Sequence, residues 1–328
     1  MRRLLYLGLV FTGLLSLTVF LVSLYRSWQL YTLAPEPDST FLYHFSLYIP
    51  DNRNSFFEGI IRGAEQAAAE LGSAVSVRSI DPFKNELQNA AFTGVDGVIV
   101  CPYLDDVLAR RQLEKLKTRQ IPVVLINHNL PSEQPWPFIG INNFDMGRRI
   151  GNILLNSPQK IGLAVVYSDK APGIYAEREL VEMGIFTSLG DRLSGPIMSF
   201  RTNLNPLDAE ALLATIFRSP GIRTVDSDSG DEERTFINTI VFTDPMDTTA
   251  AAQTLVDLNL VGQIRIIGFG ADSGVIENLR KGIINASVVI NSERIGYEAI
   301  HSLAALRTTG YTSASIDIGI DIITSGSP

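Results

Sequence analysis

The sequence is poor in the residues that build covalent or metal-based sites. It has one cysteine, Cys101, and three histidines among 328 residues. One cysteine excludes an intrachain disulfide and a multi-cysteine metal site, although it does not decide the redox compartment. A zinc site would need carboxylates beside these few histidines, and their separation in the chain gives no reason to group them. We therefore expect no metal ion and no cofactor.

Motifs of catalysis are absent as well. The chain has no glycine-rich phosphate loop with a lysine, no His-Glu-x-x-His and no Gly-x-Ser-x-Gly. Gly268-Phe269-Gly270 does not open a dinucleotide fingerprint, because the next glycine, Gly274, stands at the wrong spacing. We therefore expect that the protein is not an enzyme.

Basic residues are outnumbered along the chain. The 27 Lys and Arg against 35 Asp and Glu give a formal net charge of −8. Without Arg2, Arg3 and Arg26, which lie in a stretch that has no acids, 24 basic residues face 35 acidic ones. Such a body binds phosphate backbones poorly, so we expect no nucleic-acid partner.

Length and composition indicate a folded protein. Hydrophobic residues make up 45% and charged residues 19%, which is neither a disordered nor a collagen-like composition. At roughly 150 residues per domain, the chain predicts two compact domains with ample core.

A long apolar run lies near the amino terminus. Residues 4–25 are 22 consecutive residues without charge. As a helix rising about 1.5 Å per residue, this run covers a hydrocarbon core of about 30 Å. The alternative is a cleaved signal peptide, whose apolar stretch is usually about 7–15 residues long. The nearest small-residue site, residues 32–34, is followed by Pro35, which disfavours cleavage.

We therefore expect a transmembrane anchor over residues 1–26 and a linker over residues 27–40. The amino terminus with Arg2 and Arg3 outweighs Arg26, so the positive-inside rule places the short tail in the cytoplasm. The protein is then a single-pass protein of the cell membrane whose body is extracytoplasmic.

Short apolar runs alternate with amphipathic stretches along the body. This switch between periods of 2 and 3.6 residues indicates βαβ units. The expected strands are residues 42–49, 75–80, 98–101, 123–127, 161–166, 197–200, 239–242, 264–269 and 286–290. The expected helices are residues 60–71, 105–117, 146–155, 175–189, 207–217 and 248–258. Near-continuous Val and Ile runs are typical of parallel strands covered on both faces, so the fold class is α/β.

Two further stretches predict local structure alone. Residues 219–234 are rich in Gly, Ser and acids and predict a solvated surface loop. Isoleucines at every second position of residues 316–322 predict one edge strand with one exposed face.

Seven motifs follow one another in the body. They are residues 49–57, 61–68, 94–100, 121–124, 141–143 with Gly147, 266–270, and 286–289 with Gly296-Tyr297. In this order they resemble the type I periplasmic solute-binding proteins, the sugar-binding proteins related to the ligand domains of lactose-repressor-like regulators. The resemblance covers about residues 41–326.

The resemblance implies two similar doubly wound parallel-sheet lobes. Three crossovers join them, and hinge motion closes the lobes on a small polar ligand. The expected first lobe is residues 41–141 plus 291–316, and the second is residues 142–290 plus 317–328.

The first candidate site residues follow the first apolar run. In open parallel sheets ligands bind beyond the carboxyl ends of the strands. A sugar needs carboxylates or amides at its rim and aromatic rings on its C–H faces. Asp51 follows the run, Asn54 matches the family's amide, and Phe56 and Phe57 match its aromatic pair. The alternative is that one or both phenylalanines are core residues at the start of the next helix.

Asn127 and His128 stand where the family usually has an Asp-Arg pair that grips sugar hydroxyls. The replacement keeps hydrogen-bonding capacity and drops both fixed charges. His128 is either a ligand contact, which would make binding pH-sensitive, or a partly exposed loop residue. Asn142 is a further candidate near the family's hinge, while Asn143 is the candidate cap of the next helix.

The second lobe departs more from the family. Arg178 is nearest to the family's arginine, although its spacing to Gly184 is longer than usual. Asp244 and Asp247 follow an expected strand end, so one can bind the ligand while the other caps the helix.

Two familiar polar positions are lost. Gly270 replaces an aspartate and Ile290 replaces a glutamine that are common in the family, which leaves Asp272 and Asn291 as the nearest polar residues. A hydroxyl loses its orientation when its dedicated partner is missing, so we expect a pocket that does not hold the family's most familiar pentose in the familiar way.

Two functions remain open. The protein is the receptor of an ABC-type importer, which closes on a sugar or polyol and docks on a permease, or a ligand-sensing receptor beside a membrane histidine kinase of a two-component system. Family frequency favours transport, whereas the anchor and the altered pocket favour sensing. A pocket used only for protein contact is the third alternative. The related regulators carry a helix-turn-helix where this chain has its apolar run, so we expect no transcription factor.

Overall fold

The computed structural model divides the chain into residues 1–41 and residues 42–328. It describes residues 13–27, 41–50, 54–81, 84, 86–102, 106–155, 157, 159–168, 172–202, 206–218, 221–225 and 232–325. Residues 13–27 are helical, and their large apolar side chains are exposed. Residues 1–12 of the expected anchor and residues 28–40 of the expected linker lie outside the described residues. Within the described ranges, no helix combines the length and the apolar character needed to cross a membrane.

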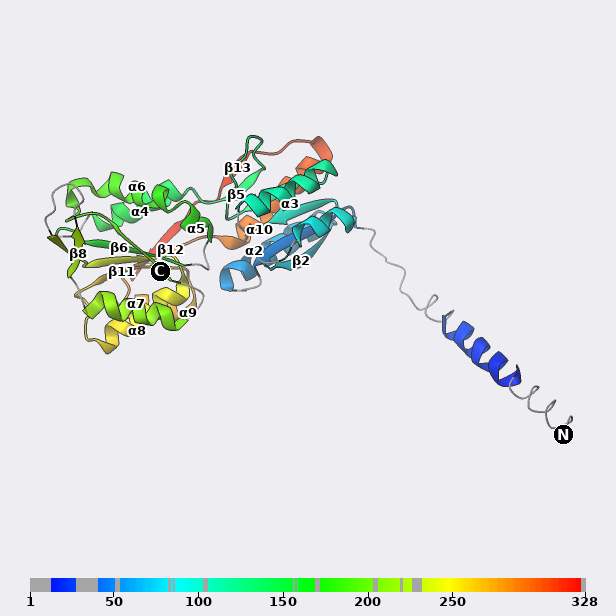
Figure 1. Cartoon of the computed structure of the whole chain (residues 1–328), viewed down its shortest axis with the longest axis horizontal. Coiled ribbons are helices and arrows are strands. Elements are labelled where there is room, and N and C mark those ends of the chain that lie inside the picture. Colours follow the sequence, from blue (N-terminus) through cyan, green and yellow to red (C-terminus); the bar gives the residue numbers. More distant parts are fainter. Residues whose placement is uncertain are drawn as a thin grey trace. The chain divides into compact units, whose positions relative to one another are not determined.

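The first lobe is a six-stranded parallel sheet in the order β13-β5-β4-β3-β1-β2 (Figure 1). Its strands are β1 (His44–Pro50), β2 (Ala74–Ile80), β3 (Gly97–Val100), β4 (Val123–Ile126), β5 (Phe138–Gly140) and β13 (Ser315–Asp317). Its helices are α2 (Ser55–Glu70), η1 (Leu87–Phe92), α3 (Asp106–Thr118) and α10 (Ser292–Thr309). Every residue of β3 and β4 is buried, as the near-continuous Val and Ile runs predict.

Helices cover both faces of this sheet. Leu47 belongs to a core cluster with α2 and α10, whereas its neighbour Tyr48 belongs to a cluster with η1 and α3. Successive residues of a strand point to opposite faces, so the doubly wound arrangement follows directly from the buried run.

The second lobe repeats this plan in the order β14-β12-β11-β10-β6-β7. Its strands are β6 (Leu163–Ser168), β7 (Met198–Thr202), β10 (Thr239–Phe242), β11 (Arg265–Phe269), β12 (Ala286–Val289) and the antiparallel β14 (Asp321–Thr324). Its helices are α4 (Asn143–Leu154), α5 (Pro172–Ala176), α6 (Arg178–Leu189), η2 (Gly190–Arg192), α7 (Pro206–Arg218), α8 (Pro245–Asp257) and α9 (Ser273–Arg280).

Three crossovers connect the lobes: β5 to α4, β12 to α10, and β13 to β14. The third corrects the prediction of one edge strand over residues 316–322, because the segment divides between the two sheets. Gly319 takes a positive φ of 71° at the break, where a side chain would be strained. Asp317 Oδ1 accepts the backbone N–H of Gly319 at 2.9 Å and that of Asn142 at 3.2 Å, and so ties two crossovers together.

Glycines bring pairs of helices into close contact in each lobe. A Cβ on Gly63 would overlap the backbone carbonyl of Glu293 on α10, and one on Gly296 would overlap that of Ile60 on α2. Gly147 of α4 has the same relation to α6. These motif glycines therefore serve helix packing.

Two other local predictions are wrong. Residues 219–234 are not simply a loop, because β8 (Gly221–Val225) pairs antiparallel with β9 (Glu232–Phe236). The helix expected over residues 175–189 divides into α5 and α6. Pro172 opens α5, and Glu177, at φ −108° and ψ 24°, separates the two helices.

Candidate ligand-binding site

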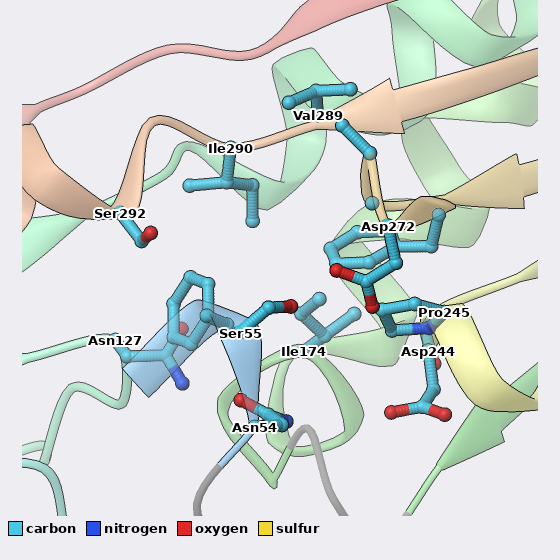
Figure 2. Close-up of a pocket in the computed structure, with 15 residues that line it drawn as sticks. Asn54, Ser55, Asn127, Ile174, Asp244, Pro245, Asp272, Val289, Ile290 and Ser292 are labelled. Atoms are coloured by element: carbon cyan, nitrogen blue, oxygen red, sulfur yellow. The ribbon is translucent and has the colours of Figure 1, made fainter. Parts of the chain in front are cut away.

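A pocket of about 190 Å³ lies between the lobes, at the carboxyl ends of strands from both sheets. That volume far exceeds the ~10–15 Å³ needed for one water and is below the roughly 300–1,000 Å³ of sites for drug-sized ligands. The first lobe contributes Asn54, Ser55, Phe56, Asn127 and Ser292 (Figure 2). The second lobe contributes Ile174, Thr243, Asp244, Pro245, Phe269, Gly270, Ala271, Asp272, Val289 and Ile290.

The start of α2 places three of the first-lobe residues. Asn54 caps the helix, and its Oδ1 accepts the backbone N–H of Phe57 at 3.1 Å. Ser55 and Phe56 then open the helix at the pocket, with Ser55 exposed and Phe56 partly buried. Phe56 meets Phe57 edge to face, with ring centroids 5.4 Å apart.

Phe57 lies in the core, where it is 2% exposed. Consecutive side chains on an α-helix differ in direction by about 100°, since one turn takes 3.6 residues. The two rings therefore point in different directions, and the structure places Phe56 at the pocket and Phe57 in the core.

Asn127 enters the pocket from a γ-turn that follows β4. Its φ is 62°, and the backbone N–H of His128 donates to the carbonyl of Ile126 at 2.7 Å. Asparagine tolerates this left-handed conformation better than most residues. Its Nδ2 also lies 4.0 Å from Sγ of the buried Cys101, whose pKa burial raises to about 12.

The same turn directs His128 into the protein. His128 is 6% exposed and lies outside the pocket lining. Its Nε2 lies 3.0 Å from Oδ1 of Asp106, the first residue of α3. The geometry makes His128 a buried partner of α3, which differs from both alternatives considered for it above.

The two aspartates at the start of α8 occupy different environments. Asp244 lines the pocket, but its Oδ1 caps α8 by accepting the backbone N–H groups of Met246 at 2.9 Å and Asp247 at 3.1 Å. Figure 2 shows its carboxylate turned away from Ser55 and Asp272. Asp247 is buried and accepts the hydroxyl of Thr202.

Asp272 directs its carboxylate into the pocket. It precedes α9, yet its side chain makes no capping hydrogen bond. Figure 2 shows this carboxylate facing the hydroxyl side of Ser55, which belongs to the other lobe.

The other predicted site residues lie elsewhere. Asn142 Oδ1 accepts the backbone N–H of Asp145 and caps α4, while Asn291 Oδ1 accepts that of Arg294 and caps α10, each at 3.0 Å. The guanidinium of Arg178 lies over the ring of Tyr175, 4.9 Å from its centroid. Asp51 lies outside the described residues.

Apolar residues of the second lobe were not predicted as site residues. Ile174, Pro245, Phe269, Val289 and Ile290 line the pocket. The only sign of these residues in the sequence is their position, because most of them lie at strand ends, where the ligand is expected to bind. Sequence reasoning also missed Ser55 and Ser292, which open helices in the first lobe.

The two altered positions noted in the sequence, Gly270 and Ile290, both line the pocket. Gly270 has a φ of 83°, and a Cβ there would come within 2.8 Å of Cγ of Pro245. An aspartate would therefore be strained at this position. Nowhere in the described ranges do three or more His, Cys, Asp or Glu side chains form a group that could hold a metal ion.

The two lobes and the pocket between their strand ends define a two-lobed α/β fold. Residues 45–175 match the family described as "Periplasmic binding protein domain". No curated protein sequence matches the chain.

Solved structures with the same fold cover most of this chain. A glucose-galactose binding protein, GanP, from Geobacillus stearothermophilus has a TM-score of 0.72 at 20% identity, over 86% of this chain and 97% of its own. A Caulobacter myo-inositol binding protein bound to myo-inositol has a TM-score of 0.72 at 21% identity, over 90% and 96%. A carbohydrate transporter solute binding protein from Agrobacterium radiobacter, in complex with D-arabinose, has a TM-score of 0.70 at 17% identity, over 86% and 94%.

Residues 45–175 thus match the periplasmic binding protein family, and the body of the chain has the two-lobed type I fold of these solved structures. The two-lobed prediction is confirmed.

Proposed function

We propose that the protein is an extracytoplasmic receptor that binds a small, neutral, polyhydroxylated solute, a sugar or polyol, between its lobes. The observation that carries this proposal is the pocket itself. It combines the amides of Asn54 and Asn127 with the hydroxyls of Ser55 and Ser292, beside the partly buried ring of Phe56. Amides and hydroxyls suit sugar hydroxyls, and an aromatic ring suits a C–H face.

The charge of the lining favours a neutral solute over an anion. Asp244 and Asp272 are the charged residues among the described lining, which contains no Lys, Arg or His. A carboxylate or phosphate on the solute would approach these aspartates without a cation to offset the repulsion. The solutes named for the similar structures, glucose, galactose, D-arabinose and myo-inositol, are neutral and polyhydroxylated, which supports the same class.

We propose further that residues 4–25 anchor the protein in the cell membrane and that its partner is the permease of an ABC-type sugar importer. The run is uncharged and long enough to span, and its described part is helical with exposed apolar side chains. The same anchor favours the second function, a ligand sensor beside a membrane histidine kinase, because a sensor gains from fixed stoichiometry. Neighbouring genes decide between them: a permease and an ATPase indicate transport, and a kinase with a response regulator indicates sensing.

A thermal-shift screen tests the binding function. The full chain in detergent is titrated with neutral monosaccharides and polyols, and with sugar phosphates and sugar acids as charged controls. Binding to the native state raises the melting temperature. We expect shifts from neutral solutes alone; shifts confined to the charged set, or none from any solute, would contradict the proposal.

A further inference from the structure

The two walls of the pocket differ in the hydrogen bonds they can still make. The first lobe offers four polar side chains, Asn54, Ser55, Asn127 and Ser292, beside the ring of Phe56. Among the described residues, the hydroxyls of Ser55 and Ser292 have no hydrogen-bond partner, and Asn54 uses only its Oδ1. This wall therefore has free donors and acceptors.

Most of the polar groups in the second-lobe wall already form hydrogen bonds within that lobe. The hydroxyl of Thr243 donates to the carbonyl of Val166 at 3.2 Å and accepts the backbone N–H of Ser168 at 3.1 Å. Gly270 donates its N–H to Val288 at 2.8 Å, and its carbonyl accepts the hydroxyl of Ser287 at 2.6 Å. Asp244 caps α8 in the same way. In the described part of this wall, Asp272 is therefore the polar side chain that points into the pocket.

The rest of that wall is apolar and already packed. Ile174 is 3% exposed, Phe269 8% and Ile290 9%, and Pro245, Val289 and the exposed Ala271 also line this wall. Figure 2 shows the side chain of Ile290 beside Ser292, pointing into the part of the pocket that Ser55 also borders. A solute hydroxyl pressed against these side chains would lose its water without gaining a partner, whereas a methyl group would gain contact.

We infer that the solute is a deoxygenated sugar, with hydroxyls against the polar side chains of the first lobe, one C–H face on Phe56, and a methyl group or other deoxygenated C–H surface against the second lobe. This inference rests on the proposed function and names the class of sugar. Asp272 accepts hydroxyls at the edge of the apolar wall. The unpaired hydroxyl of a fully hydroxylated counterpart lowers affinity by about 5- to 100-fold.

Matched pairs of sugars test the inference on the full chain in detergent. Calorimetry compares D-galactose with D-fucose, L-galactose with L-fucose and L-mannose with L-rhamnose, together with the deoxy counterpart of every sugar that binds in the screen above. For the configuration that binds best, we expect the deoxy member to bind about 5- to 100-fold tighter.

Other outcomes separate the two proposals. A hexose that binds as tightly as its deoxy partner, or tighter, overturns the inference and leaves the proposed function intact. A protonated amino sugar such as galactosamine that binds tighter than both also overturns it, because Asp272 rather than the apolar wall then decides recognition. If no sugar or polyol binds, the proposed function fails together with the inference.

The variant Ile290→Gln tests whether the apolar wall causes the preference for the deoxy sugar. The added amide gives a hydroxyl its partner, so we expect the preference to shift at least 5-fold toward the hydroxylated member of the pair. Ile322→Gln is the matched control, because Ile322 is a partly buried isoleucine of the second lobe outside the pocket, and it should leave the preference unchanged. Melting temperatures without sugar report whether each variant folds, and if Ile290→Gln does not fold, the wild-type pairs still decide the inference.

Discussion

Replacing Phe56 by alanine should weaken solute binding while leaving the fold nearly intact. A fully buried phenylalanine removes about 150–250 Å² from water, and a solute against one ring face covers roughly a quarter to a third of that, ~40–80 Å². At about 25 cal/mol per Å² this burial contributes ~1–2 kcal/mol, or about a 5- to 30-fold rise in Kd. Calorimetry with the tightest-binding neutral sugar measures the change.

The adjacent Phe57 provides the matched control. Phe57 is 2% exposed in the core, so Phe57→Ala should lower the free energy of unfolding by about 3–5 kcal/mol. Phe56→Ala should change it by much less, because Phe56 is only partly buried. Denaturant melts and calorimetry on both variants separate stability from binding. A Kd for Phe56→Ala within 2-fold of wild type would refute the assignment of this ring to the solute.

Asn127→Ala should weaken sugar binding by about 0.5–1.5 kcal/mol, or roughly 2- to 13-fold in Kd, through one lost hydrogen bond; an unchanged Kd in calorimetry would remove Asn127 from the site. Burial raises the pKa of Cys101 to about 12, so its thiol should resist Ellman's reagent at pH 8 in the folded protein and react after unfolding. Because the unfolded thiol ionises near 8.5, this group makes the free energy of unfolding fall as pH rises from about 8.5 towards 12. Gly296→Ala should destabilise the protein by about 1–3 kcal/mol through overlap with α2, seen as a drop of about 2–10 °C in Tm, and an unchanged Tm would contradict the packing role. Mass spectrometry of membrane-extracted protein should find residues 4–25 retained; a mature chain that starts after Arg26 would refute the anchor.

The alternation of strands and helices was predictable because buried parallel strands leave an unmistakable pattern. Residues 123–126 are all apolar, and the structure buries all four in β4. The prediction of one edge strand over residues 316–322 is wrong because its pattern is ambiguous. Isoleucines at every second position look the same in one strand as in two short strands, and the sequence does not reveal that Gly319 adopts a φ of 71° between them.

Part of the candidate site was predictable from its position after strand ends. Asn54, Phe56, Asn127, Asp244 and Asp272 were expected there, and each lines the pocket. The sequence does not show which polar side chains will cap a helix. For this reason Asn142 and Asn291 look like site residues in the sequence, although they cap α4 and α10.

The apolar wall was missed for a related reason. Isoleucine or phenylalanine at a strand end is ordinarily a core residue, and only the meeting of two lobes turns Ile290 and Phe269 into pocket lining. Residues far apart in sequence decide this, so no local pattern reveals it. His128 likewise depended on the γ-turn at Asn127, which turns its side chain towards α3.

A crystal structure of the protein with its tightest-binding neutral sugar tests whether the solute binds in this pocket. We expect sugar density between the lobes, with one C–H face on Phe56, hydroxyls within hydrogen-bond distance of Ser55 or Asn127, and the least polar side of the sugar against Ile290. Sugar bound elsewhere, or a pocket that stays empty while the sugar binds in solution, would contradict this expectation.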